Sequence, residues 1–296
     1  MKNFCIYSQV LIYGFFILKS KIMDFKPSIY QRVVFNKFKN SDKNLIISAV
    51  AGSGKTTTIV SCIDFIPKGK DSIFFAFNNH IVKELQSKIK RYDVKVSTLH
   101  SFCWKSLQNH FKKQKLSLNK NKAYKYTERK IRKNAIPKKK QGTYYFSILS
   151  LVDLVRQNLI VGDRFMITKL ADYHDIWWDD LALDMLDEVL EEMDRDKLEM
   201  DYTDMIYRCI KENVRFEMFD YIFVDESQDL SKMQQEIIKR VKKTKGKMIA
   251  VGDKHQCQPS DTNVLLAGGI IKKISELRVG DGIVSYDKNS GSFTYL

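Results

Sequence analysis

The chain has 296 residues, and a 44% hydrophobic content is ample for a folded core, which excludes a disordered chain. Its 50 Lys and Arg against 35 Asp and Glu give a formal charge of +15, which favours a polyanionic partner such as nucleic acid. The excess consists mostly of lysine, 39 against 11 arginines, so an AT-rich genome explains it equally well. The five cysteines form no C-x-x-C pair, which argues against a zinc knuckle or a disulfide framework and fits a reducing compartment.

An apolar run at residues 4–18 resembles a membrane anchor, but a span needs about 20 apolar residues. No small-residue cleavage site follows it, and Met23 provides a second possible start. We therefore expect residues 1–22 to be an over-extended reading frame, with a membrane tether as the alternative. We expect a cytoplasmic protein, or one at a nuclear or viral replication site if the source is a eukaryotic virus.

Helix and strand signals alternate from residue 28 onward. Ser28 and Gln31 form a capping-box pattern, which predicts a helix that runs to about Lys39. Apolar runs predict buried strands at Leu45–Val50, Ser72–Phe77, Val94–Thr98, Tyr221–Val224 and Lys247–Val251. This alternation predicts an α/β fold with a parallel sheet covered by helices. The long gap between the third and fourth strands predicts an inserted helical subdomain at about residues 104–212.

Charge is distributed unevenly within the expected insertion. Residues 112–140 carry 13 Lys and Arg against one acid, Glu128, with Tyr124 and Tyr126 interleaved. This basic tract either contacts a nucleic-acid backbone while the tyrosines stack on bases, or is a solvated helix face. Residues 172–204 carry 14 acids, which we expect to face water because the apolar residues between them recur at helical spacing.

A phosphate-binding loop is indicated where the first strand meets the next helix. Gly52-Ser53-Gly54-Lys55-Thr56 stands in the strand, loop and helix order that such a loop requires. Glycines let backbone amides turn toward phosphate oxygens, and the helix N-terminus adds partial positive charge. Lys55 is expected to reach the β- and γ-phosphates, and the Thr56 hydroxyl to hold Mg²⁺. Ala49 occupies the first position of the motif, where glycine is usual.

Two acids follow the fourth apolar strand directly. Asp225 is placed to bind magnesium, and Glu226 to take a proton from the attacking water. Acids after a strand are often solvent-facing turn residues. Their coincidence with a phosphate loop favours the catalytic interpretation.

Six motifs in order resemble those of the UvrD/Rep-like superfamily 1 DNA helicases, across about residues 25–256. Besides the phosphate loop there are five further motifs. They are a glutamine before the loop, one motif at the end of the second predicted strand, one at the end of the third, D-E-S-Q-D and G-D-K-H-Q. These motifs stand at Gln31, Phe75–Asn78, Thr98–Phe102, Asp225–Asp229 and Gly252–Gln256. Asp201-Tyr202-Thr203-Asp204 is a weaker match to a further element of the family. The resemblance implies a RecA-like P-loop NTPase domain, 1A, with a 1B-like helical insertion beside the DNA.

The resemblance also implies roles for individual residues, with ATP and Mg²⁺ as cofactors. The implied catalytic residues are Lys55, Asp225, Glu226 and Gln256, of which Gln256 senses the γ-phosphate. The implied ATP-binding residues are Gln31, which reads adenine, and Ala51, Gly52, Ser53, Gly54, Lys55, Thr56 and Thr57. The implied metal ligands are Thr56 and Asp225. The implied contacts to single-stranded DNA, or to a junction of duplex and single strand, are Phe77, Asn78, Thr98, His100, Ser101 and Phe102.

Helicases of this class complete the ATP site with an arginine from a second motor domain, whose motifs the printed chain does not contain. An arginine finger contributes about 10³ to 10⁵ in rate. We therefore expect this fragment to bind nucleotide, to turn it over poorly and to unwind nothing. The alternative function is a stand-alone nucleotide-dependent DNA-binding module without unwinding activity.

After Gln256 the helicase pattern stops, and residues 257–296 resemble the N-terminal segment of a Hint-type intein. The resemblance rests on the leading Cys257, on D-T-N-V at 261–264, on I-S-E-L at 274–277 and on V-G-D at 279–281, while Ser260 replaces the usual glycine. A thiol there can attack the preceding carbonyl and convert the amide to a thioester. We expect a partial or split intein that reacts with a complementary polypeptide carrying the intein C-half and the second helicase domain. The alternative is an ordinary insertion.

Overall fold

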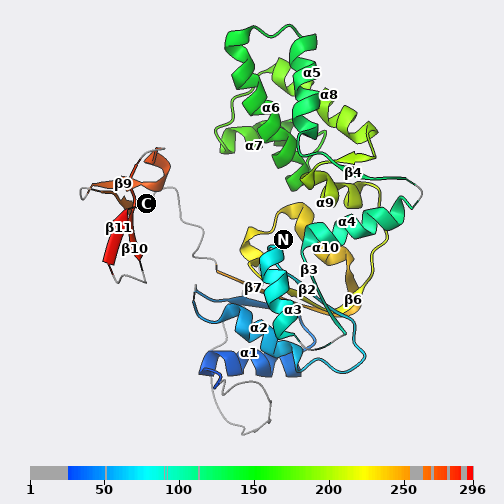
Figure 1. The fold of residues 1–296 in the computed structure, drawn as a ribbon, viewed down its shortest axis with the longest axis vertical. Helices are drawn as coiled ribbons and strands as arrows, with labels where there is room; N and C mark the ends of the chain where they lie inside the picture. Colours follow the sequence, from blue (N-terminus) through cyan, green and yellow to red (C-terminus); the bar gives the residue numbers. More distant parts are fainter. Residues whose placement is uncertain are drawn as a thin grey trace.

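The structure is a computed structural model that describes residues 26–50, 52–89, 91, 93–112, 114–253, 263–267, 270–278, 281–287 and 292–295. Its centre is a five-stranded sheet in the order β1-β7-β6-β2-β3, in which every neighbouring pair is parallel (Figure 1). The strands are β1 (Leu45–Ser48), β2 (Ser72–Phe75), β3 (Val94–Ser97), β6 (Phe219–Val224) and β7 (Lys242–Gly252). The predicted α/β fold with a parallel sheet is confirmed.

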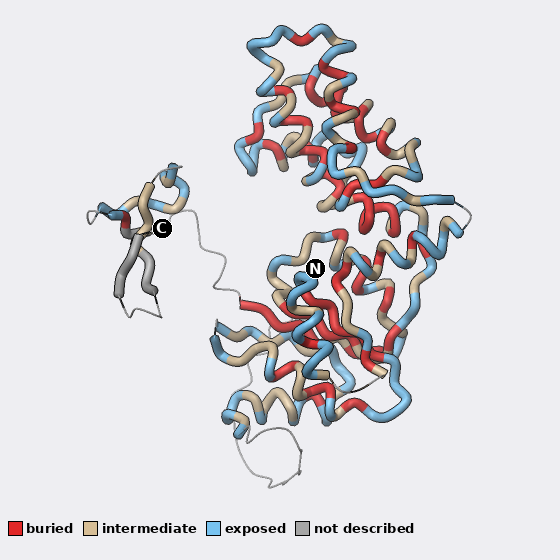
Figure 2. The backbone as a smooth tube through the Cα atoms, in the orientation of Figure 1, coloured by how far each residue is buried: buried red, intermediate tan, exposed pale blue. Residues whose placement is uncertain are grey.

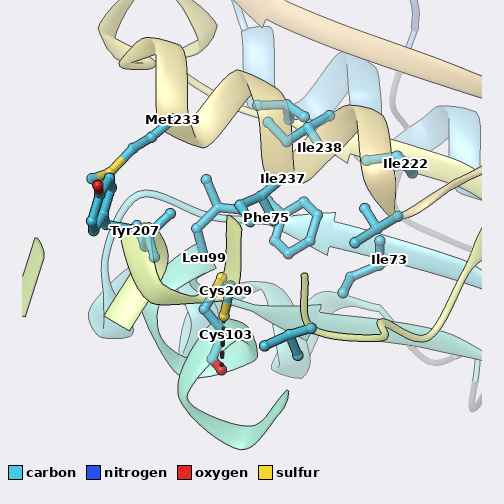
Figure 3. Packing of buried hydrophobic residues seen from close by; sticks show 14 of the residues in the cluster. Ile73, Phe75, Leu99, Cys103, Tyr207, Cys209, Ile222, Met233, Ile237 and Ile238 are labelled. Carbon is cyan, nitrogen blue, oxygen red and sulfur yellow. Dashed lines mark hydrogen bonds between the residues drawn. The ribbon is translucent and has the colours of Figure 1, made fainter. Parts of the chain in front are cut away.

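Helices cover both faces of this sheet, so successive strand residues enter two different cores. Phe74 and Phe223 point into the cluster beneath α1 (Ile29–Asn40), α2 (Lys55–Ile63) and α3 (Asn79–Lys88). Ile73 and Ile222 point into the cluster beneath α4 (Leu99–His110), α9 (Tyr202–Lys211) and α10 (Lys232–Arg240), which is drawn in Figure 3. Burial on both faces explains why these strands read as unbroken apolar runs.

The first predicted helix is confirmed at its start, whereas the first predicted strand differs from expectation in its burial. Helix α1 begins after Ser28, whose side chain accepts from the Gln31 N–H in the predicted capping box. Strand β1 was expected to be buried on both faces, and this is wrong, because it lies at the edge of the described sheet and Ile46 is 71% exposed. An apolar run predicts a strand but does not tell how many neighbours that strand has.

A second set of helices forms a hydrophobic cluster of its own. It consists of α5 (Lys122–Lys133), α6 (Lys138–Asn158), α7 (Arg164–Tyr173) and α8 (Asp180–Arg195), which pack around residues such as Ile148 and Leu186 (Figures 1 and 2). The two-residue strands β4 (Ser117–Leu118) and β5 (Glu199–Met200) pair in parallel next to them. Within the predicted insertion of residues 104–212, helices α4 and α9 instead pack on the sheet.

The acidic residues of 172–204 were predicted to face water. This is not so for all of them, because α8 packs against the basic helix α5. Lys130 contacts Glu188 and Glu192 at 2.6 and 2.5 Å, and Lys133 lies 3.0 Å from Glu188. The hydroxyl of Tyr126 donates to Asp196 at 2.9 Å. Part of the basic tract is therefore neutralised by acids within the molecule.

A buried group of charges joins these helices to α9. Arg156 in α6 donates to Asp201 at 2.8 Å and to Asp204 at 2.9 Å, and Lys122 in α5 donates to Asp204 at 2.7 Å. Burial raises the pKa of the Asp204 carboxyl, against the opposing effect of the two cations. Arg208 donates to the Met193 carbonyl at the end of α8. One cluster of charges thus fixes α5, α6 and α8 relative to α9.

Residues after 262 form two short antiparallel pairs. Strand β8 (Asn263–Leu265) pairs with β9 (Ile271–Lys273), and β10 (Val284–Asp287) pairs with β11 (Ser292–Tyr295). A bridge between Leu266 and Ile283 connects the two pairs. Among the described cysteines, Cys62, Cys103 and Cys209 are free and buried. No helix in the described part of the chain has the length and apolar character needed to cross a bilayer, and the apolar run at residues 4–18 lies outside that part.

Replacing Arg156 by methionine should destabilise the fold strongly. The guanidinium is 1% exposed, and its loss leaves the buried carboxylates of Asp201 and Asp204 without their main partner. Breaking a buried pair in this way costs about 3 to 5 kcal/mol, measurable by urea unfolding. The matched control is Arg164→Met, which removes half-exposed pairs to Asp184 and Asp187 and should cost about 1 kcal/mol or less. Equal losses in the two variants would contradict a structural role for the buried cluster.

Candidate nucleotide site

The phosphate loop leaves β1 and enters α2 at the edge of the sheet where all five parallel strands end. Gly52 and Gly54 have φ values of 74° and 78°, which residues with a side chain rarely adopt. Gly54 is the N-cap of α2, and Lys55 is the first helical residue. The free amides of this helix start are therefore presented at the loop, as phosphate binding requires.

An ion pair and a hydrogen bond connect the start of α2 to the residues that follow β6. Lys55 Nζ lies 3.1 Å from Glu226 Oε2, and Thr56 Oγ1 donates to Asp225 Oδ2 at 2.9 Å. The Lys55 side chain is 8% exposed and that of Glu226 29%, so this ion pair is largely shielded from water. The structure thus brings together four residues that the sequence assigned separately to phosphate, metal and proton transfer.

Burial raises the pKa of Asp225, and the hydrogen bond from Thr56 opposes that shift. A buried carboxylate beside a hydroxyl is a suitable ligand pair for a hard cation, because Mg²⁺ takes oxygen ligands and is usually held by one or two carboxylates together with substrate phosphates. Among the described residues no group of three or more His, Cys, Asp or Glu forms a metal cage. Thr56 and Asp225 therefore fit a magnesium ion that completes its coordination with phosphate and water.

Gln31 lies next to the loop although it precedes it by more than 20 residues. Its Nε2 donates to Thr58 Oγ1 at 3.0 Å, and its Oε1 accepts from the Ser28 N–H at 2.9 Å. A Cβ placed on Gly54 would meet Gln31 Nε2 at 3.4 Å. Thr57 is exposed at the start of α2, Ser53 is exposed in the loop, and Ala51 and Gln256 lie outside the described residues.

The residues predicted to contact DNA follow β2 and β3, at the same edge of the sheet as the phosphate loop. Phe77 is 66% exposed and His100 is partly buried, which lowers the pKa of its imidazole. The Asn78 side chain caps α3 by accepting from the Ile81 N–H. Phe77 and His100 therefore have the accessible surface that a ligand contact needs.

Two other predicted DNA contacts, Thr98 and Phe102, have a role in the local fold, whereas Ser101 is exposed. Thr98 Oγ1 accepts from the Ser101 N–H as the cap of α4, and its hydroxyl donates to Ser101 Oγ. The ring of Phe102 stacks on Phe216 at 5.8 Å and meets Phe75 edge-on at 5.5 Å. Helix capping and core packing therefore account for the residue types at Thr98 and Phe102.

One aromatic residue of this region was absent from the predicted site. Tyr202 begins α9, is 48% exposed and meets the His100 ring edge-on at 6.4 Å. Lys120 Nζ lies 5.8 Å from the centre of the Tyr202 ring. The available signal was the acidic-aromatic element at residues 201–204, which sequence reasoning noted without assigning a contact.

Comparison with known proteins decides the family. Residues 34–257 match the UvrD/REP helicase N-terminal domain. The chain belongs to the UvrD/REP helicase family. It is 25% identical over 246 residues to the ATP-dependent DNA helicase PcrA of Bacillus subtilis, an alignment that covers 74% of this chain and 32% of the relative. The chain therefore spans about a third of the length of that helicase.

Two substitutions in the site should change nucleotide affinity in opposite directions. Lys55→Ala removes a charge-assisted contact of about 1.5 to 3 kcal/mol and should weaken Mg·ATP binding about tenfold or more. Glu226→Gln removes the anion that holds Lys55 in the absence of nucleotide, a gain of about 1 kcal/mol or about fivefold in affinity. Calorimetry checks both, with the exposed Lys37→Ala as control. Equal affinity in wild type and Lys55→Ala would rule out this nucleotide site.

Proposed function

We propose that this chain is the ATP-binding half of an ATP-dependent DNA helicase or translocase, a RecA-like 1A domain with helices α5–α8 as its 1B-like insertion. The observation that carries the proposal is the pairing of Lys55 with Glu226 and of Thr56 with Asp225 across the end of the sheet. Its family supports the same function. The calorimetric comparison of Lys55→Ala with Glu226→Gln tests it.

The chemistry assigned to the site is hydrolysis of the terminal phosphate of ATP. Bound magnesium supplies Lewis-acid stabilisation of phosphate charge, held by Thr56 and Asp225. Lys55 leaves Glu226 to bind the phosphates, and the freed Glu226 carboxylate takes a proton from the attacking water. Gln31 selects adenine, and Gln256 contacts the γ-phosphate.

The proposed DNA contact lies at Phe77, His100 and Tyr202, with Lys120 beside it. Three observations support it, namely the exposure of Phe77 and Tyr202, the contact of Tyr202 with His100, and the position of Lys120 over the Tyr202 ring. Exposed aromatic rings stack on bases regardless of sequence, and an adjacent cation contacts the backbone. The alternative is a stand-alone nucleotide-dependent DNA-binding module. It predicts that this chain does not unwind duplex DNA even when it is joined to a second motor domain.

Tyr202→Ala should weaken binding of single-stranded DNA, because each base stacked on an aromatic side chain contributes about 1 to 3 kcal/mol. Lys120→Gln should instead lower the slope of log affinity against log salt by about 0.7 for one lost phosphate contact. Fluorescence anisotropy with a labelled oligonucleotide over a salt series measures both.

Lys133→Gln is the matched control, since Lys133 is as exposed as Lys120 but already pairs with Glu188. Its slope should equal that of wild type. If Lys133→Gln lowers the slope as much as Lys120→Gln, the binding surface lies on α5 rather than beside Tyr202.

We further propose that residues 257–296 are the N-terminal segment of an intein and that Cys257 is the splicing nucleophile. Two observations support this, since the helicase match ends at residue 257 and the described part of the tail forms short antiparallel strands. Cys257 itself lies outside the described residues. In the first step its sulfur attacks the carbonyl carbon of Gln256, the Gln256–Cys257 C–N bond breaks, and the released amine takes up the thiol proton.

Mixing this chain with a polypeptide that carries the intein C-half and the second helicase domain should yield a longer chain without residues 257–296. Mass spectrometry across the new junction at Gln256 detects it. Cys257→Ala should abolish that product and leave Mg·ATP affinity unchanged, because the thiol has no part in phosphate binding. Cys209→Ala, a buried thiol in α9, controls for the loss of a cysteine elsewhere. Ligation by the Cys257→Ala variant would refute the assignment.

A further inference from the structure

Gln228 connects the proposed catalytic carboxylate to the neighbouring strand. It lies in the short 3-10 turn η1 (Ser227–Asp229), immediately after Glu226 at the end of β6. Its Nε2 donates to Glu226 Oε2 at 3.0 Å and to Asp229 Oδ2 at 3.2 Å. Its Oε1 accepts from the Asp253 N–H, just past the end of β7, at 3.1 Å. One side chain thus contacts both strands that end at the site.

The backbone at the end of β7 is shaped to admit this side chain. A Cβ added to Gly252 would lie 2.5 Å from Gln228 Oε1 and 2.9 Å from Ser227 Oγ, so a methyl group there would require these two side chains to move. Glu226 has a φ of 47°, in the left-handed region that non-glycine residues seldom occupy. A glycine that leaves room and a strained backbone at the reacting residue are features of a site held in a required geometry.

The two donors to Glu226 have different fates during the proposed reaction. Lys55 and Gln228 both contact Glu226 Oε2, at 3.1 and 3.0 Å. Lys55 must leave when phosphates bind, so the carboxylate then loses a charged partner. Gln228 carries no charge and is not required by the phosphates, and it can keep its hydrogen bond throughout.

We propose that Gln228 is a positioning residue for ATP hydrolysis, which holds Glu226 in place once Lys55 has moved to the phosphates. Through the Asp253 N–H it also links the end of β7 to that carboxylate. This inference rests on the proposed ATPase function of the site. Because the amide has separate donor and acceptor atoms, its two contacts can be removed separately.

The experiment compares Gln228→Glu with Gln228→Met in this chain. The glutamate keeps an oxygen for the Asp253 N–H and replaces the hydrogen bond to Glu226 by repulsion between two carboxylates, whereas the methionine makes neither contact at similar volume. Hydrogen exchange at the Asp253 amide should be about tenfold faster in Gln228→Met and unchanged in Gln228→Glu. ATP cleavage, followed with protein in excess over labelled ATP, should fall about tenfold in both variants with Mg·ATP affinity little altered.

A double-variant comparison separates positioning from general damage to the fold. In a Glu226→Gln background, Gln228→Met should cause no further loss of cleavage, since its effect acts through the carboxylate that is already gone. Gln235→Met, which removes an exposed amide on α10 that donates to the Leu230 carbonyl, should leave exchange at Asp253 and cleavage unchanged.

Unchanged exchange at Asp253 in Gln228→Met would overturn the inference, as would cleavage at the wild-type rate in Gln228→Glu. If the wild-type chain neither binds nor cleaves ATP, the proposed function fails instead. Exchange at Asp253 still decides the link itself, because that measurement needs no nucleotide.

Discussion

The geometry of the candidate nucleotide site depends on strand β7, which lies between β1 and β6 and pairs with both. Its parallel pairing places Val251 beside Ile47 of β1 and Ile249 beside Phe223 of β6. This register sets the separation of the phosphate loop from the acids, and Lys55 and Glu226 can meet only because that separation is fixed. A slip of one residue would turn the side chains of β7 to the opposite face of the sheet. Ile249 and Val251 are buried in one core and the smaller Ala250 in the other, so such a slip would exchange side chains of different size between two packed cores.

Patterns of residues that are close in sequence predicted the helix starts and strand ends around this sheet. The capping box at Ser28, the glycines of the loop and the acids after β6 each depend on residues that are close in sequence, so their patterns can be read directly. Pairings over long sequence distances could not be read in this way. The basic and acidic stretches were interpreted as two separate surfaces, whereas Lys130 and Glu192 are 62 residues apart and in contact. Periodicity tells which face of a helix is polar, but not which helix it meets.

The same limit applies to the residues predicted to contact DNA, which differ in exposure and in local role. A family motif marks positions, and a single position can serve binding, capping or packing. Thr98 caps α4 and Phe102 packs in the core, while Phe77 and His100 keep accessible surface. Tyr202 joins His100 only because α9 packs on α4, a contact between segments more than 100 residues apart. The motifs therefore predict which edge of the sheet carries the candidate site, and tertiary packing decides which side chains are accessible there.

The position of the proposed splice junction has a consequence for the order of events. Every strand of the described sheet is complete by Gly252, and the contact of Gln228 with Asp253 fixes the last described backbone before the junction. Among the described residues, none beyond Asp253 belongs to this sheet or to the two hydrophobic clusters on its faces. Folding of the described sheet therefore does not have to wait for the proposed splicing.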